Sequence, residues 1–521
     1  MRDRPVVPRL RQRSPVHGLR RRGLGPLEVL AQSVSGAAPS AAMAATPAIV
    51  AVSAGGATVW SFVAATVLAL LIAGCIARFT RRMAAPGGLY TLTAKGLSPG
   101  AAFACGVALL VGYGMLAAAA LVGGATYLQA LVLRLGGTGS VVLPVVAVVV
   151  VGLAAGGLAL RGVRLSARVV LLAELVSITL MLAIFVLLLA APLPGPDAAQ
   201  PGPGLGGVAA GVLPALAAFI GFEVATSLGA EARRPFRSVP RAVTATAVVS
   251  GLLCVFAAQT QVVGFAAAPG GLAGQNAPVA VLATARGWPW VAPLLDLGLT
   301  MSFFACVLAT VNGIARVLFS LGRDGVAPRG FGRTHPRFAT PHVAIGVVAP
   351  VLVVVLAVAL LAGAPLGGTL TFLLTVGTGG FLVAYLLVCL AAPVFLRRIG
   401  ELTWPAVAAT AVIVPILVAV LVAFVARSGG TPVVVVLAAL AVAGACWFGW
   451  LRLRRPDRIA GIGVYDETVA DDVLGADVVG AGVPGGGDGP GTGGPGTGGP
   501  GTDGPGTGGS RGPDARPDRA A

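Results

Sequence analysis

The sequence predicts an all-α integral membrane protein with about twelve transmembrane helices, on the basis of its composition and its apolar stretches. Of its 521 residues, 56% are hydrophobic and 11% are charged, and the mean hydropathy is +0.91. Soluble globular domains carry about 25% charged residues, so this composition excludes that class. Because roughly 20 apolar residues cross the hydrocarbon core as a helix, the spans can be located directly.

Three regions follow one another along the chain. Residues 1–25 form an arginine-rich arm, residues 26–455 a transmembrane domain, and residues 456–521 a polar tail. The first apolar stretch is too long for the core of a signal peptide, so we expect the arm to be retained. The tail repeats Gly-Pro-Gly-Thr-Gly, which cannot bury a core, so we expect it to be disordered.

The expected spans are rich in Ala, Gly, Val and Leu, and small residues let membrane helices pack closely. In order they are residues 28–53, 57–77, 100–133, 141–160, 169–189, 207–230, 242–266, 291–321, 343–362, 369–396, 404–425 and 432–450. Only residues 136–140 separate the third span from the fourth, which predicts a tight hairpin there.

Basic residues lie on alternate connections between the spans. The opposite connections carry only Arg134, Arg286 and Arg427 nearby. Since cytoplasmic loops are enriched in Lys and Arg, the basic connections are predicted to be cytoplasmic. With twelve spans, both termini would then be cytoplasmic in a multi-pass protein of the plasma membrane. This placement accounts for the net charge of +17 without a nucleic-acid partner.

Two spans are interrupted at their centres by residues that membrane helices normally avoid. The interruptions read Ser35-Gly36-Ala37-Ala38-Pro39-Ser40 and Phe219-Ile220-Gly221-Phe222-Glu223. Irregular backbone at membrane depth must be satisfied by protein, water or ligand, and it usually lines a cavity. Matching breaks in the two halves of a chain indicate the substrate site of a transporter.

Several motifs occur in order around these breaks. They are Met83-Ala84-Ala85-Pro86-Gly87-Gly88-Leu89-Tyr90, then Gly221-Phe222-Glu223 with Glu231, Pro235 and Pro240-Arg241, and finally Ala315-Arg316-Val317-Leu318-Phe319-Ser320-Leu321-Gly322-Arg323-Asp324-Gly325. Over about residues 25–455 the chain resembles the amino acid–polyamine–organocation (APC) permease family. The resemblance implies a five-plus-five inverted repeat with discontinuous first and sixth helices, whose unwound centres hold the substrate.

The substrate-binding candidates follow from the chemistry of an amino acid. The half-helix that begins near Pro39 offers free N–H groups and a positive dipole end, which suit a carboxylate. Carbonyls freed at the second break suit an ammonium group. The residues assigned to these roles are Ser35, Gly36, Ala37 and Ala38 for the carboxylate, Phe219, Ile220 and Gly221 for the ammonium, and Phe222 and Tyr113 beside them. For the three aromatic residues, plain packing is the open alternative.

Five further residues are candidates for gating or ion coupling: Glu223, Glu174, Asp296, Thr310 and Asn312. An ionisable residue inside the membrane is a functional candidate by default, and a structural partner is the alternative for each carboxylate. Thr310 and Asn312 are candidate sodium ligands. Several proton-coupled relatives carry a lysine in the fifth span, and this chain has none there. The coupling ion, H⁺ or Na⁺, stays open.

The sequence therefore predicts a secondary transporter that moves an amino acid or related amine by alternating access, with no cofactor, catalytic residue or structural metal. A solute sensor on a transporter scaffold is one alternative. An integral-membrane enzyme is another, but His17, His335 and His342 form no cluster of the kind such an enzyme needs. No Gly-x-x-x-x-Gly-Lys loop for ATP occurs. The oligomeric state and the exact substrate stay open.

Overall fold

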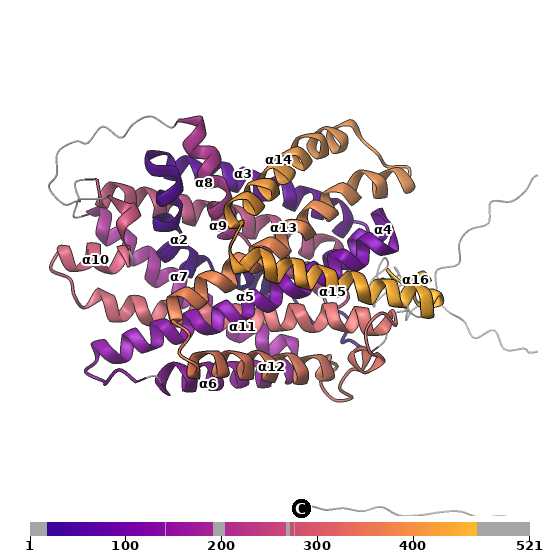
Figure 1. The fold of residues 1–521 in the computed structure, drawn as a ribbon, viewed down its shortest axis with the longest axis horizontal. Helices are drawn as coiled ribbons and strands as arrows, with labels where there is room; N and C mark the ends of the chain where they lie inside the picture. Colours follow the sequence, from indigo (N-terminus) through magenta and orange to yellow (C-terminus); the bar gives the residue numbers. More distant parts are fainter. Residues whose placement is uncertain (1–17, 141, 191–203, 267–270, 276, 466–521) are drawn as a thin grey trace, which may run out of the picture. The chain divides into compact units, whose positions relative to one another are not determined.

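The fold is built from helices that run back and forth along one direction (Figure 1). The computed structural model describes residues 18–140, 142–190, 204–266, 271–275 and 277–465, all within the unit Met1–Val473. In these ranges no strand occurs, and the strand-like features are isolated bridge residues, such as the bridge between Leu24 and Ala232. The predicted all-α class is therefore confirmed.

The helices agree with the expected spans to within a few residues at most ends. In order, the α-helices are α1 (Pro26–Ala37), α2 (Pro39–Ala54), α3 (Thr58–Thr80), α4 (Leu89–Gly96), α5 (Pro99–Arg134), α6 (Val142–Leu160), α7 (Val163–Ala190), α8 (Leu205–Ala217), α9 (Pro235–Gly264), α10 (Pro278–Ala285), α11 (Val291–Arg323), α12 (His342–Leu361), α13 (Leu366–Arg398), α14 (Trp404–Ser428), α15 (Pro432–Arg454) and α16 (Pro456–Ala460). Short 3₁₀ helices are η1 (Gly55–Ala57), η2 (Phe222–Leu228), η3 (Leu272–Gly274) and η4 (Arg329–Gly332).

Among the described residues, eleven continuous helical stretches are long and apolar enough to cross a membrane, one fewer than predicted. The difference lies in the first stretch, Pro26–Thr80, which joins the first two expected spans into 55 residues through η1. About 20 residues suffice for one crossing, so this stretch is long enough to cross twice.

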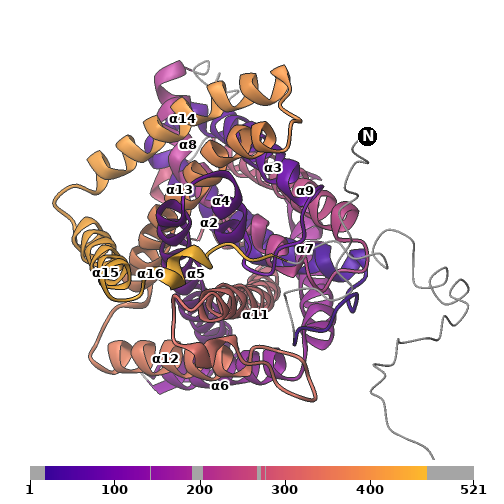
Figure 2. The same cartoon turned by 90° about the vertical axis from the view of Figure 1, so that its right-hand side faces the viewer.

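The long helices α5 and α11 pack along each other and form the centre of the unit, with α13 against α5 (Figures 1 and 2). The helices α6 and α12 form a pair on one side, and α14 and α15 lie on another. The first broken helix packs against α7, α9 and η2. The two breaks therefore lie inside the bundle, next to α11.

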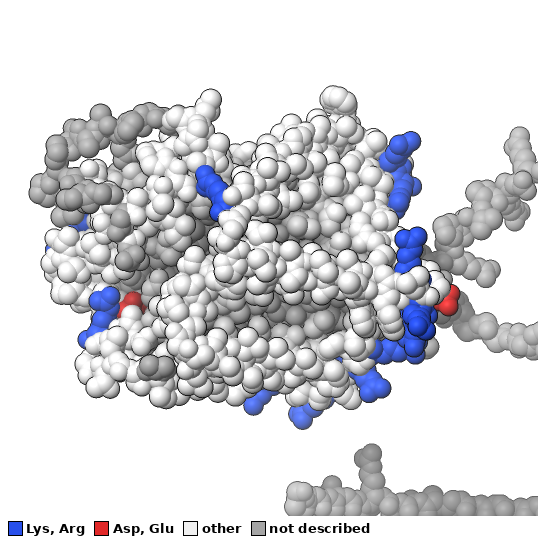
Figure 3. Space-filling model, in the orientation of Figure 1, with Lys and Arg blue, Asp and Glu red and all other residues white. Residues whose placement is uncertain are grey.

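One end of the unit is strongly basic, and we call it the basic end. Figure 3 shows Lys and Arg gathered at the end where α4 and α16 lie. Both ends of the described chain lie here, because Leu19 packs with Ala230 and Phe319, and Arg458 donates a 3.2 Å hydrogen bond to the carbonyl of Gly325.

Residues just outside both ends of the expected membrane domain are described by the structure. Residues 18–25 of the expected arm and residues 456–465 of the expected tail pack against the membrane domain. The tail's first residues are held by polar contacts that hydropathy does not reveal, such as the 2.5 Å bond from Arg323 to the carbonyl of Val464. The rest of the arm, 1–17, and of the tail, 466–521, lie outside the described residues.

Candidate functional site

The first break is a single left-handed residue between α1 and α2. Ala38 has φ 45° and ψ 60°, a conformation that costs a non-glycine residue about 1–2 kcal/mol. Pro39 follows directly, and a proline disfavours the right-handed helical conformation in the residue before it. Proline is also well suited to begin a helix, so the local sequence itself ends α1 and starts α2.

The second break separates α8 from η2. Gly221 has φ 100°, which glycine adopts readily and other residues rarely do. The carbonyls of Phe219 and Gly221 accept backbone N–H groups from Phe222 at 3.3 Å and Val224 at 3.1 Å. Within the described ranges, the carbonyl of Ile220 accepts no such bond. Of the three carbonyls expected to bind an ammonium group, Ile220 therefore supplies the open one.

The two breaks touch each other through their backbones. A Cβ atom on Gly36 would overlap the carbonyl oxygen of Gly221, and a Cβ atom on Gly221 would overlap the carbonyl oxygen of Gly36. Two side-chain bonds reinforce this contact: Ser33 donates its hydroxyl to the carbonyl of Phe222, and the Cys306 thiol donates to the carbonyl of Gly36 at 3.6 Å. The structure thus brings both halves of the expected substrate site together.

Polar atoms without partners surround the contact. The hydroxyls of Ser35 and Ser40 flank the first break, are fully buried and have no hydrogen-bond partner. The hydroxyl of Thr226 and Oε1 of Glu223, beside the second break, are unpartnered as well. Buried polar groups are nearly always satisfied, so a cluster of exceptions indicates a place for a ligand or water. Ser40 was not among the residues predicted from the sequence.

Glu223 connects the second break to a neighbouring helix through hydrogen bonds. Its Oε2 accepts the N–H of Gly221 at 3.2 Å and the hydroxyl of Tyr385, on α13, at 2.5 Å. The hydroxyl of Tyr113 also approaches this carboxylate. The ring centroids of Phe222 and Tyr385 lie 5.7 Å apart, so Phe222 packs against the residue that donates to the Glu223 carboxylate. Tyr385 was missed in the sequence analysis, because nothing local distinguishes it from a packing tyrosine.

Every predicted substrate-binding residue is buried. The exposed fraction is 7% for Ala37 and Ala38, 6% for Ile220, and 2% or less for Tyr113 and Phe222. The arrangement is therefore closed to solvent on both sides. A site that binds a solute in this position must open for the solute to enter.

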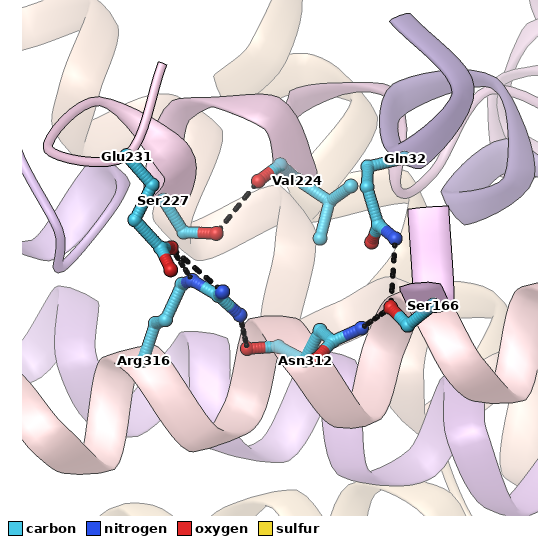
Figure 4. Close-up of polar contacts among 7 residues, drawn as sticks. All are labelled: Gln32, Ser166, Val224, Ser227, Glu231, Asn312 and Arg316. Atoms are coloured by element: carbon cyan, nitrogen blue, oxygen red, sulfur yellow. Dashed lines mark hydrogen bonds and ion pairs between the residues drawn. The ribbon is translucent and has the colours of Figure 1, made fainter. Parts of the chain in front are cut away.

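A buried polar network extends from the first break along α11 (Figure 4). The hydroxyl of Ser166 on α7 accepts the side-chain amides of Gln32 at 3.3 Å and Asn312 at 2.8 Å. One turn further, Arg316 donates to the carbonyl of Asn312 and forms a 2.7 Å ion pair with Glu231; both charged side chains are 1% exposed. The network connects α1, α7 and α11 to the segment that follows η2.

The remaining coupling candidates do not meet at the breaks. Glu174 accepts the Ser302 hydroxyl at 3.0 Å across the α7–α11 interface, and its other oxygen is unpartnered. Asp296 pairs with Arg134 at 2.8 Å. The hydroxyl of Thr310 donates within its own helix, to the carbonyl of Cys306 at 2.6 Å. Asn312 belongs to the network of Figure 4.

The motif residues at the basic end form a second cluster. Asp324 accepts the hydroxyl of Tyr90 at 2.8 Å, the N–H of Gly463 at 3.2 Å and the guanidinium of Arg323 at 3.1 Å. Burial raises the pKa of the Asp324 carboxyl above its ordinary value, although Arg323 and Tyr90 act in the opposite direction. Asp324 therefore joins the first turn of α4, the end of α11 and the segment after α16.

Comparison with known sequences gives a consistent pattern. The profile described as amino acid permease matches residues 24–448. "Branched-chain amino acid permease BcaP" of Bacillus subtilis is 30% identical over 313 residues, which are 56% of this chain and 66% of that protein.

Two further relatives match shorter parts of the chain. An uncharacterized transporter of Mycobacterium tuberculosis is 31% identical over 147 residues, 28% of this chain and 33% of its own. "Cationic amino acid transporter 6, chloroplastic" of Arabidopsis thaliana is 27% identical over 140 residues, 26% of this chain and 23% of its own. The chain thus spans less than two thirds of the length of these curated relatives.

Proposed function

Because the chain belongs to the amino acid permease family, as its resemblance to the APC permeases predicted, we propose that it is a secondary transporter that carries an amino acid across the membrane by alternating access. The observation that carries this proposal is the contact between the two helix breaks, with unpartnered buried hydroxyls around it. The proposal assigns the chain no chemical reaction on the solute.

The amino acid backbone would lie between the two breaks. The first turn of α2 leaves N–H groups without helical partners, and together with the hydroxyls of Ser35 and Ser40 these favour a carboxylate. The open carbonyl of Ile220 favours the ammonium group. For the solute's side chain we propose an apolar, branched group. Support comes from the apolar character of Phe219, Ile220 and Phe222 and from the printed name of the Bacillus subtilis relative.

For coupling we propose a proton rather than sodium. The Thr310 hydroxyl donates to its own helix and the Asn312 amide donates to Ser166, so both side chains are held by protein contacts that require no cation. In contrast, Glu174 and Glu223 each have one buried carboxyl oxygen without a donor, which is suited to hold a proton. Glu223 is the better placed of the two, because it bonds directly to Gly221 at the break.

For orientation we propose that the basic end faces the cytoplasm, in the plasma membrane. Lys and Arg favour the cytoplasmic side, and Figure 3 shows them concentrated at this end. Both ends of the described chain lie there, which requires an even number of crossings. This count fits eleven stretches of which the first crosses twice.

The test is uptake into liposomes that contain the purified full chain. Labelled leucine, isoleucine, valine, arginine and lysine are offered under an inward pH gradient, a sodium gradient or neither. We expect the branched-chain amino acids to accumulate under the pH gradient alone. Accumulation of arginine or lysine instead would overturn the proposed side-chain class, and accumulation under sodium alone would overturn the proposed coupling. No uptake of any amino acid under any gradient, including counterflow, would overturn the transporter proposal.

A further inference from the structure

The last membrane helix, α15, is the least buried of the eleven apolar stretches among the described residues. Of its 23 residues, only Val433 and Leu451, near the two ends, are buried. Figure 2 shows α15 at the margin, beside α16. By contrast, α14 buries a regular stripe that includes Ile413, Leu417 and Phe424. The middle of α15 contacts α5 and α13 through residues such as Gly444, beside Val107, and Leu437, beside Gly379, but it buries none of its side chains fully.

The space beneath α15 is a cavity of about 660 Å³ between α5, α13, α14 and α15. All of its lining residues are Gly, Ala, Val, Leu or Phe. On α15 the lining runs from Val434 to Phe448, which at 1.5 Å per residue is about 21 Å of helix. Exposed lining residues such as Ala104, Ala438 and Ala441 leave the cavity open to the surrounding membrane.

The lining identifies hydrocarbon as the occupant. A buried water needs two to four polar partners, and these side chains offer none. A flexible acyl chain is apolar along its whole length, can fill an irregular space of this kind, and is present at high concentration at this depth of the membrane.

One end of the cavity lies at the basic end of the unit. Phe448 packs on Phe103 at 5.1 Å and lies against Gly100, in the first turn of α5. Arg452 follows Phe448 by one helical turn, on the same face of α15, and is exposed. An exposed arginine and the positive end of a 36-residue helix both favour an anionic group at this mouth.

We propose that this cavity, which we call the α15 groove, binds one anionic phospholipid, with an acyl chain along α15 and the phosphate beside Arg452. The lipid would fill the space that the protein leaves between α15 and the core. Neither substrate transport nor the helix breaks enter this argument, so the inference is independent of the proposed function.

The test uses the purified full chain in detergent, with phosphatidylglycerol or phosphatidylcholine of identical acyl chains as the probe. Bound lipid is counted by native mass spectrometry, and the shift in melting temperature is recorded in parallel. Ala441→Trp fills the groove. Ala443→Trp is the matched control, because this exposed residue of the same helix does not line the groove. Arg452→Gln removes the charge at the mouth.

We expect phosphatidylglycerol to bind more tightly than phosphatidylcholine. Ala441→Trp should weaken both by at least about tenfold, Ala443→Trp should change neither, and Arg452→Gln should weaken only phosphatidylglycerol. Unchanged lipid binding in Ala441→Trp would overturn the proposal, as would a loss of self-association in that variant without a loss of lipid. If wild type binds phosphatidylglycerol and phosphatidylcholine with equal affinity, and Arg452→Gln does the same, the headgroup assignment is overturned. Should Ala441→Trp fail to fold, Ala438→Phe blocks the same groove with a smaller side chain.

Discussion

Tyr385 and Glu223 are joined by a 2.5 Å hydrogen bond from the phenol to Oε2, which ties α13 to the second helix break. The carboxylate is fully buried, and the same oxygen accepts the backbone N–H of Gly221. The geometry of the break therefore depends in part on a residue of α13.

Removing this donor should loosen the break. For Tyr385→Phe we expect the free energy of unfolding to fall by about 1–3 kcal/mol, the range for losing a hydrogen bond to a buried carboxyl group. Thermal unfolding in detergent measures this loss. Tyr127→Phe is the matched control, because the Tyr127 ring stacks on Phe303 with 5.8 Å between the ring centroids. Loss of the Tyr127 hydroxyl should lower the free energy of unfolding by less than about 0.5 kcal/mol. Equal losses in both variants would contradict the prediction.

Neutralising Glu223 separates its two possible roles. Glu223→Gln keeps an oxygen that can accept the Gly221 N–H and the Tyr385 hydroxyl, but it cannot exchange a proton. We expect uptake driven by a pH gradient to be lost while counterflow exchange of unlabelled for labelled substrate persists. The two assays are run on the same liposomes. Gradient-driven uptake at the wild-type rate would leave Glu223 with a structural role alone.

The contact between the breaks should tolerate no side chain. In Gly36→Ala, the new Cβ must displace the Gly221 carbonyl, so we expect a loss of about 1–3 kcal/mol in the free energy of unfolding and at least a tenfold loss of uptake. Gly114→Ala is the control, since a Cβ at that position in α5 meets no atom and should be neutral or stabilising by up to about 1 kcal/mol. Wild-type stability and uptake in Gly36→Ala would refute the proposed constraint.

Breaking the buried ion pair between Arg316 and Glu231 (Figure 4) should lower the free energy of unfolding more than replacing both charges does. Arg316→Met leaves Glu231 as an unpaired buried carboxylate, for which we expect a loss of about 3–5 kcal/mol. Arg316→Met combined with Glu231→Gln removes both charges and should recover part of that loss. The free energy of unfolding of both single variants and the double variant gives the coupling. Additive losses would show that the two side chains do not stabilise each other.

Asp324 should make stability depend on pH. Its pKa is raised in the folded state by burial, so the folded protein holds the proton at a pH where the unfolded chain has released it. This contribution to stability is full below the ordinary carboxyl pKa of about 4 and is lost as the pH rises through the raised value. In Asp324→Asn, the melting temperature should decline less over this acidic range than in wild type. Parallel curves for the two proteins would be evidence against the raised pKa.

Local chemistry explains which parts of the site could be predicted. Ala38 precedes a proline, and Gly221 lies within an apolar stretch, so both breaks were readable from adjacent residues. Ser40 lies within the first break as read from the sequence, but which hydroxyls there lack a partner depends on the packing around them. Tyr385 could not be found in this way, because its importance arises from a bond to the distant Glu223, and no signal in its own neighbourhood distinguishes it from a packing residue.

In the fold, too, features with a local sequence signal were predictable, and features that depend on distant contacts were not. Hydropathy located the long helices, because burial in lipid acts on every residue of a span. It missed α4 and the contacts of residues 456–465, whose positions depend on a few polar bonds such as that from Gly463 to Asp324. Hydropathy also placed two spans within Pro26–Thr80, which the structure joins through the short helix η1 and which is long enough to cross the membrane twice.

The mutual overlap at Gly36 and Gly221 has a consequence for the evolution of the family. A side chain at Gly36 would overlap the backbone of Gly221, and a side chain at Gly221 would overlap the backbone of Gly36. A substitution at one position cannot move the backbone at the other position out of the way. Among relatives that keep this contact, neither residue can change to compensate for the other. We therefore expect two independently invariant positions with no covariation between them, so methods that infer contacts from correlated substitutions would overlook this close approach between the two halves of the chain.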